Sequence, residues 1–128
     1  MRKNKVFESY RRGQVVFADL GYSDEGVQGG IRPCVIVSCD KSNHFKAPQI
    51  TVCPLSSKIK ENKVHVQLHP LDVNGYHLRQ ISDMLPEDIQ TIAKKRVRGT
   101  IGFIDNKSEI MKKINAALIM QLGLGDDE

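Results

Sequence analysis

The stretch RPCVIVSC, residues 32–39, is almost wholly apolar from Pro33 to Val37. Such a run predicts a buried β-strand, because β-branched side chains pack well on a pleated surface. Comparable runs lie on both sides of it along the chain, at residues 14–20, 49–55, 63–68 and 97–104. The run at 63–68 alternates apolar and polar residues, as a strand with one solvated face does. The chain is therefore predicted to be mainly β.

Helical signals are confined to the second half of the chain. Asp105 is a suitable N-cap for a helix from Lys107 to Leu122, and Gly123 is a typical C-terminal stop. A short helix is predicted from Thr91 to Arg96, whereas 79–91 is ambiguous. Six or seven short strands and one terminal helix predict an α+β fold. We expect a small, strongly bent antiparallel barrel, partly covered by the helix.

Composition places the chain in a broad class. With 128 residues, 40% hydrophobic and 27% charged, it resembles one ordinary soluble domain. The longest uncharged apolar stretch, 114–122, is far shorter than the ~20 residues of a membrane span. The basic N-terminus lacks the apolar core of a secretory signal, so a cytoplasmic location is expected. Cys34, Cys39 and Cys53 are expected to be buried thiols, and neither a metal nor another cofactor is expected.

The charge is unevenly distributed. Residues 1–64 hold 11 Lys and Arg against 6 Asp and Glu, whereas residues 65–128 hold 8 against 9. A formal net charge of +4 suits a polyanionic partner such as a nucleic acid. A net charge of this size is equally common on an ordinary solvated surface, so charge alone does not distinguish a nucleic-acid-binding protein from one without such a partner.

Two strings carry candidate site residues. In Gln28-Gly-Gly-Ile-Arg-Pro33, two glycines allow close backbone approach, and the proline holds Arg32 extended at the base of a loop. A guanidinium matches phosphate oxygens, although the string alone is better explained by a surface ion pair. In Cys53-Pro-Leu-Ser-Ser-Lys58, hydroxyl groups follow a strand expected to neighbour that of Arg32. If Ser56 faces the same side as Arg32, the pair supplies two donors to one anion.

Five segments in one order resemble the MazF/PemK family of toxin endoribonucleases: residues 12–20, 28–33, 53–58, 89–96 and 116–125. The resemblance implies a plasmid-maintenance-toxin barrel of the CcdB/PemK type, similar to the Src-homology-3 fold. It also implies a homodimer that cleaves single-stranded RNA, such as mRNA, at a short sequence and is inhibited by an acidic antitoxin protein. On this basis residues 12–125 form the nuclease domain, after a basic extension at 1–11 and before an acidic tail at 126–128.

The same resemblance assigns roles and marks departures. The family's catalytic arginine and its threonine or serine match Arg32 and Ser56. The departures are Val27, where an acid is common, Asp83, where an apolar or aromatic residue is usual, and Gln90 and Ala93, where an arginine and an aspartate are usual.

Metal-free RNA cleavage also needs a group that accepts the proton of the 2′-hydroxyl. Glu25 and Asp24 are the candidates, with His44 the least favoured. The residues expected to contact RNA are Gln28, Gly29, Gly30, Tyr22, Ser57, Lys58 and Lys60, whereas Phe17 is expected to lie in the core.

Two other functions stay open. One is a non-catalytic toxin of the same fold that poisons a topoisomerase by protein contact. The other is a decayed nucleic-acid-binding relative, motivated by Gln90 and Ala93.

Overall fold

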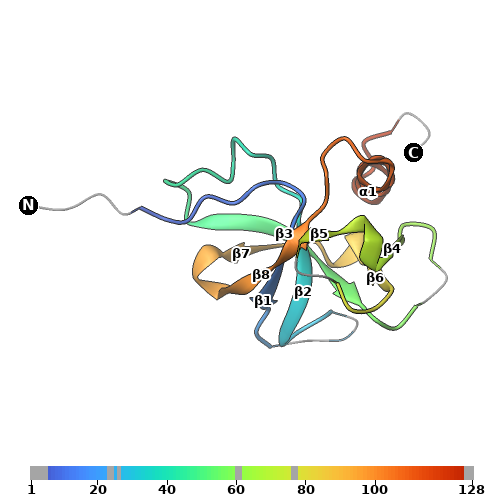
Figure 1. Ribbon diagram of the computed structural model, residues 1–128, viewed down its shortest axis with the longest axis horizontal. Helices are drawn as coiled ribbons and strands as arrows, with labels where there is room; N and C mark the ends of the chain where they lie inside the picture. The colour runs from blue at the N-terminus through green and yellow to red at the C-terminus, as the bar shows by residue number, and fades with distance from the viewer. Residues whose placement is uncertain (1–5, 23–24, 26, 60–61, 76–77, 126–128) are drawn as a thin grey trace, which may run out of the picture.

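The strands predicted from the apolar runs form one antiparallel sheet (Figure 1). The computed structural model describes residues 6–22, 25, 27–59, 62–75 and 78–125. The sheet order is β4-β6-β3-β2-β1-β8-β5, with β7 pairing with β3 off this path. The strand bounds are β1 Gln14–Asp19, β2 Ile31–Ile36, β3 Gln49–Ser56, β4 Val66–Leu68, β5 Asn74–Gly75, β6 Ser82–Met84, β7 Gln90–Ala93 and β8 Val97–Phe103. The predicted fold class is confirmed.

The sheet is curled because its long strands change partners or slip in register. The first half of β3 pairs with β7, and its last two residues pair with β6. The 3₁₀ turn η2 (Pro86–Asp88) connects β6 to β7. The β1–β8 ladder shifts register twice, between Val15 and Val16 and between Phe17 and Ala18. Such irregularities bend a strand and increase its twist, so the sheet wraps around its core.

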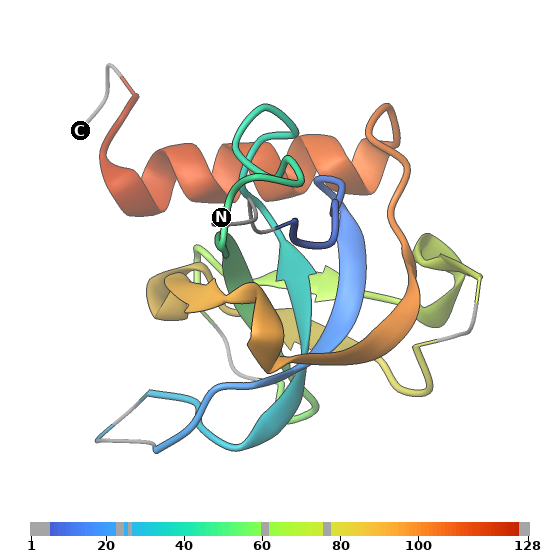
Figure 2. The ribbon, with the colours of Figure 1, turned by 90° about the vertical axis from the view of Figure 1, so that its left-hand side faces the viewer.

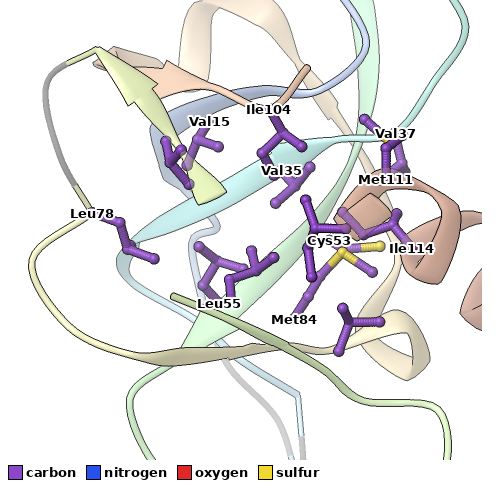
Figure 3. Packing of buried hydrophobic residues seen from close by; sticks show 14 of the residues in the cluster. Val15, Val35, Val37, Cys53, Leu55, Leu78, Met84, Ile104, Met111 and Ile114 are labelled. Atoms are coloured by element: carbon purple, nitrogen blue, oxygen red, sulfur yellow. The ribbon is translucent and has the colours of Figure 1, made fainter. Parts of the chain in front are cut away.

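Alternate residues of the strands build two apolar clusters, one on each face of the sheet. The larger cluster includes Val15, Val35, Cys53 and Leu55, and it packs against the helix α1 (Glu109–Leu122) through Met111 and Ile114 (Figure 3). The smaller cluster lies on the other face and includes Val16, Cys34, Ile36 and Val52. Figure 2 shows α1 running across the strands at one end of the sheet. Within the described residues, no helix is both long enough and apolar enough to cross a membrane.

The helix begins later than predicted, and its cap is Ser108 rather than Asp105. The Oγ of Ser108 accepts the Met111 backbone N–H at 3.2 Å. Asp105 instead stabilises the turn before the helix, because its carboxylate accepts the Lys107 N–H at 2.9 Å. Gly123, at φ 67°, ends the helix in the left-handed conformation as predicted.

Three other local predictions were wrong. Residues 91–93 of the predicted short helix belong to β7, and only Lys94–Arg96 makes a single 3₁₀ turn, η3. Pairing with β3 outweighed the local helical signal there. The strand predicted at 63–68 is reduced to β4. Cys39 is exposed, because it follows the end of β2 at the start of a turn.

The segment before β1 is attached to the sheet. The backbone N–H of Phe7 donates to the carbonyl of Phe45 at 2.7 Å, and the ring of Tyr10 is buried in the smaller cluster. The ammonium group of Lys94 donates to the carbonyls of Glu8, Asn43 and His44 at 2.6, 3.0 and 2.7 Å. Residues 7–10 of the expected extension therefore pack on the folded core, whereas the division at residue 12 stays a prediction.

Candidate functional site

The loop between β1 and β2 is closed at its base, directly before Arg32. The Gly30 N–H donates to the Gly21 carbonyl at 2.9 Å, and the Leu20 N–H donates to the Gly30 carbonyl at 2.8 Å. Both glycines have φ near +75°, which residues with a Cβ rarely adopt. The loop base is thus a rigid support for the first residues of β2.

Arg32 is half-buried, and its guanidinium is oriented by this loop. Its Nε–H donates to the Gly29 carbonyl at 2.7 Å. A guanidinium carries five N–H bonds, so the four on the Nη atoms lie outside this contact. Because the Nε bond fixes the plane of the guanidinium, the Nη atoms are pre-oriented to bind two oxygens of a group such as a phosphate.

Ser56 lies on the next strand, at the end of β3. The β2–β3 ladder pairs Cys34 with Pro54, and the same register extended by two residues puts Arg32 opposite Ser56. Residues opposite each other in an antiparallel ladder place their side chains on one face. The Oγ of Ser56 accepts the Lys58 N–H at 3.2 Å, which leaves the hydroxyl proton for another acceptor. Arg32 and Ser56 thus lie at the adjoining ends of β2 and β3, beyond the last pair of the ladder.

A row of polar side chains continues across the sheet from Ser56. Ser56 is paired with Asp83 of β6, and Asp83 is paired with Gln67 of β4. His65, two residues before Gln67, shares that face, and its Nδ1 lies 3.3 Å from Oδ2 of Asp83. Its Nε2 lies 2.5 Å from Oε2 of Glu87. Burial lowers the pKa of His65, but the hydrogen bonds and charges of Glu87 and Asp83 outweigh it and raise the pKa above its ordinary 6.5.

Asp88 connects the β1–β2 loop to the region around His65 and Glu87. Its Oδ2 accepts the backbone N–H of Gln28 at 3.2 Å. Burial raises the pKa of Asp88, and the neighbouring Glu87 charge adds to this, whereas the Gln28 N–H and His65 act against it. The sequence reasoning missed His65, Glu87 and Asp88. Asp83, an acid where an apolar residue was expected, was the one signal that pointed to this cluster.

A cavity of about 470 Å³ opens beside Arg32. Its lining includes Arg32, Ser57, Phe17, Arg79 and Gln80, but not Ser56. Phe17, expected in the core, is 44% exposed, because it borders this cavity, although Val15 on the same face of β1 is fully buried. Phe17 and Arg79 were not predicted as site residues. The combination of two guanidinium groups, hydroxyl donors and an exposed ring suits a nucleotide.

The remaining candidates are placed as follows. Tyr22 is 91% exposed in the β1–β2 loop, and Glu25 is also exposed there. Lys58 is exposed just after Ser56, whereas Asp24 and Lys60 lie outside the described residues. His44 precedes β3, at the end opposite Ser56, which removes it as a proton acceptor. Among the described residues, no group of three or more His, Cys, Asp or Glu side chains could hold a metal ion.

Residues 11–122 match the family described as the PemK-like, MazF-like toxin of type II toxin-antitoxin systems. The chain belongs to this family. The resemblance seen in the five sequence segments is thereby confirmed.

Individual relatives of this MazF-like toxin agree in sequence and in structure. The chain is 34% identical over 116 residues to the endoribonuclease MazF of Staphylococcus saprophyticus, covering 89% of this chain and 92% of that protein. A mycobacterial endoribonuclease, solved in complex with its cognate antitoxin, is 26% identical with a TM-score of 0.70 and coverages of 93% and 98%. MazF from Deinococcus radiodurans shares the fold, with a TM-score of 0.72 at 19% identity and coverages of 91% and 98%.

Proposed function

We propose that this protein is a toxin endoribonuclease that cleaves single-stranded RNA at a short sequence without a metal ion. The relatives named as endoribonucleases support this assignment. The observation that carries it is that Arg32 and Ser56 lie at the adjoining ends of β2 and β3, where the ladder register continued by two residues would put them opposite each other. A cation and a hydroxyl donor on one face are what a phosphate that gains negative charge requires.

The proposed reaction uses the 2′-hydroxyl of the RNA as nucleophile. Its oxygen bonds to the adjacent phosphorus as the bond to the 5′-oxygen breaks, which leaves a 2′,3′-cyclic phosphate and a 5′-hydroxyl. Arg32 neutralises the added charge, and Ser56 donates to a non-bridging oxygen. Glu25 or Asp24 accepts the proton of the nucleophile, and a proton from solvent water converts the leaving 5′-oxygen into the hydroxyl. DNA lacks the 2′-hydroxyl and is expected to resist cleavage.

RNA would follow the loop and the cavity beside it. Gln28, Gly29 and Gly30 at the loop base, with Ser57, Lys58 and Lys60 after β3, are the proposed contacts to backbone and bases. Tyr22, and now Phe17, offer rings on which unstacked bases can lie. Arg79 adds a second cation to the cavity wall. This arrangement favours single strands, because paired bases cannot reach such rings.

The partners proposed for the toxin are a second copy of itself and an antitoxin. The chain has a net positive charge, so an acidic antitoxin segment that covers the RNA path would block it by charge complementarity. The mycobacterial relative was solved with its cognate antitoxin. The protein is proposed to act as a homodimer in the cytoplasm, where mRNA is available.

Cleavage of a mixed-sequence RNA oligonucleotide in EDTA tests the function. The wild type is expected to cut the RNA and to leave an all-2′-deoxy copy intact. Arg32→Ala and Ser56→Ala should each lose about 100- to 1000-fold in rate, whereas Ser56→Thr should retain activity. Ser57→Ala removes a proposed RNA contact but leaves the Ser56 hydroxyl in place, so it should lose less activity than Ser56→Ala. Absence of cleavage by folded wild type, or a larger loss for Ser57→Ala than for Ser56→Ala, would contradict the assignment.

A further inference from the structure

A histidine is enclosed between two carboxylates beside Ser56. The side chains of His65 and Asp83 are only 7% and 3% exposed, and that of Glu87 is 36% exposed. Both ring nitrogens of His65 face a carboxylate oxygen, at 3.3 Å for Asp83 and 2.5 Å for Glu87. Only the imidazolium form can donate to both partners at once. This geometry therefore favours the protonated, positively charged form of the His65 ring.

These three residues connect the elements that surround the proposed reaction site. His65 precedes β4, Asp83 belongs to β6 and Glu87 belongs to η2. Asp83 lies opposite Ser56 in the ladder, and Glu87 is next to Asp88, whose carboxylate holds the Gln28 N–H. The His65 bridge thus borders both the strand pair that carries Ser56 and the loop that precedes Arg32.

The charge on this face depends on the same ring. Asp83, Glu87 and Asp88 are three carboxylates on adjacent elements, and RNA phosphates passing Ser56 would be repelled by them. The other charged or titratable side chains that line the cavity next to His65 are Lys63, His69, Asp72, Glu109 and Lys113. These are two cations, two anions and a second histidine. The charges of the cations and the anions cancel, so the local net charge depends on the protonation of His65.

We propose that His65 is a positioning residue of the RNA-cleaving site, which as a cation bridges Asp83 and Glu87 and offsets their repulsion of RNA. This rests on the proposed endoribonuclease function, because it concerns the affinity of that site for its substrate. It also gives Asp83, the departure from the family pattern, a role as the buried partner that keeps the ring charged. The proton stays on His65 throughout, and no bond to it is made or broken.

The proposal has a defined pH dependence. The two carboxylates raise the pKa of His65, so the bridge is intact below the ordinary value of 6.5 and is lost as the pH rises through the raised value. Affinity for RNA should fall over that same range. The turnover rate should not follow it, because His65 transfers no proton in the reaction.

Binding of a non-cleavable all-2′-deoxy oligonucleotide, together with cleavage kinetics on RNA, tests this role across pH 5.5–9. His65→Gln should weaken binding about fivefold at pH 6 and raise KM by the same factor, with kcat changed less than about twofold. Its binding should then lack the pH-dependent step of the wild type. His65→Arg keeps a cation that can face both carboxylates, so tight binding should persist to pH 9. His44→Gln, at the far end of β3, is the matched control.

Two further measurements check that His65 itself titrates as proposed and that each variant is folded. An NMR titration of the histidines should assign to His65 a pKa that falls in Asp83→Asn, and thermal unfolding shows whether each variant is folded. The proposal is overturned if folded His65→Gln keeps the binding profile of the wild type, or if its loss appears in kcat. If no protein cleaves RNA at any pH, the endoribonuclease function fails, whereas the NMR and binding results still judge the His65 bridge.

Discussion

Replacement of Arg32 by lysine separates the charge of this side chain from its geometry. Arg32 uses its Nε–H to bind the Gly29 carbonyl at 2.7 Å and presents the Nη atoms to the substrate. Lysine keeps the charge but has no Nε donor and cannot form a bidentate contact. One lost charge-assisted hydrogen bond is worth about 1.5–3 kcal/mol, and the lost loop contact about 1 kcal/mol. Together they predict a loss of roughly 100- to 1000-fold in cleavage rate.

Single-turnover cleavage of an RNA oligonucleotide with excess enzyme measures this loss without interference from product release. The matched control is Arg11→Lys, because the Arg11 guanidinium lies 5.8 Å from the ring of Phe103, away from the loop. The control should cleave at the wild-type rate. If Arg32→Lys retains more than a third of wild-type activity while folded, the oriented fork is irrelevant and the charge alone accounts for the role of Arg32.

Two further predictions concern stability and can be checked by urea unfolding. Lys94→Met removes the donor of three carbonyl groups, and the free energy of unfolding should fall by about 2–4 kcal/mol; a fall below 0.5 kcal/mol would contradict this reading. Burial raises the pKa of Asp88, so its contribution to stability is greatest below its ordinary pKa of 3.8 and is lost as the pH rises through the raised value. Asp88→Asn keeps an acceptor for the Gln28 N–H and should therefore be more stable than the wild type at pH 8 and equal to it near pH 3. A less stable variant at pH 8 would show that the ionised carboxylate is favourable.

The sequence predicted the main strands well, because their apolar runs are long and bounded by turn residues. β1, β2, β3 and β8 lie where the runs at 14–20, 32–39, 49–55 and 97–104 placed them. The errors fall where tertiary contacts outweigh local preference. Residues 90–93 became β7 because β3 offered an edge for pairing, and Phe17 is exposed because it borders an open cavity, although it lies on the same face of β1 as the buried Val15.

Candidate site residues could be named from the sequence only where a local string suggested them. The Gly-Gly-Ile-Arg-Pro and Pro-Leu-Ser-Ser-Lys strings made Arg32 and Ser56 candidates, and the resemblance to the MazF/PemK family supplied their expected roles. His65, Glu87 and Asp88 stood in segments without any such pattern. Their contacts join residues 18 and 22 positions apart for His65, and 60 positions apart for Asp88 with Gln28. Local patterns do not report contacts at these separations.

The amino-acid sequence by itself determined the class of fold, the terminal helix and the family, because apolar periodicity and short ordered strings are properties of neighbouring residues. Tertiary structure alone decided which side chains share a face. The register of β3 and β6 placed Ser56 opposite Asp83, and folding enclosed His65 between two carboxylates. The physical reason is that strand register and burial are set by the packing of the whole sheet, which also fixes the charge of that histidine.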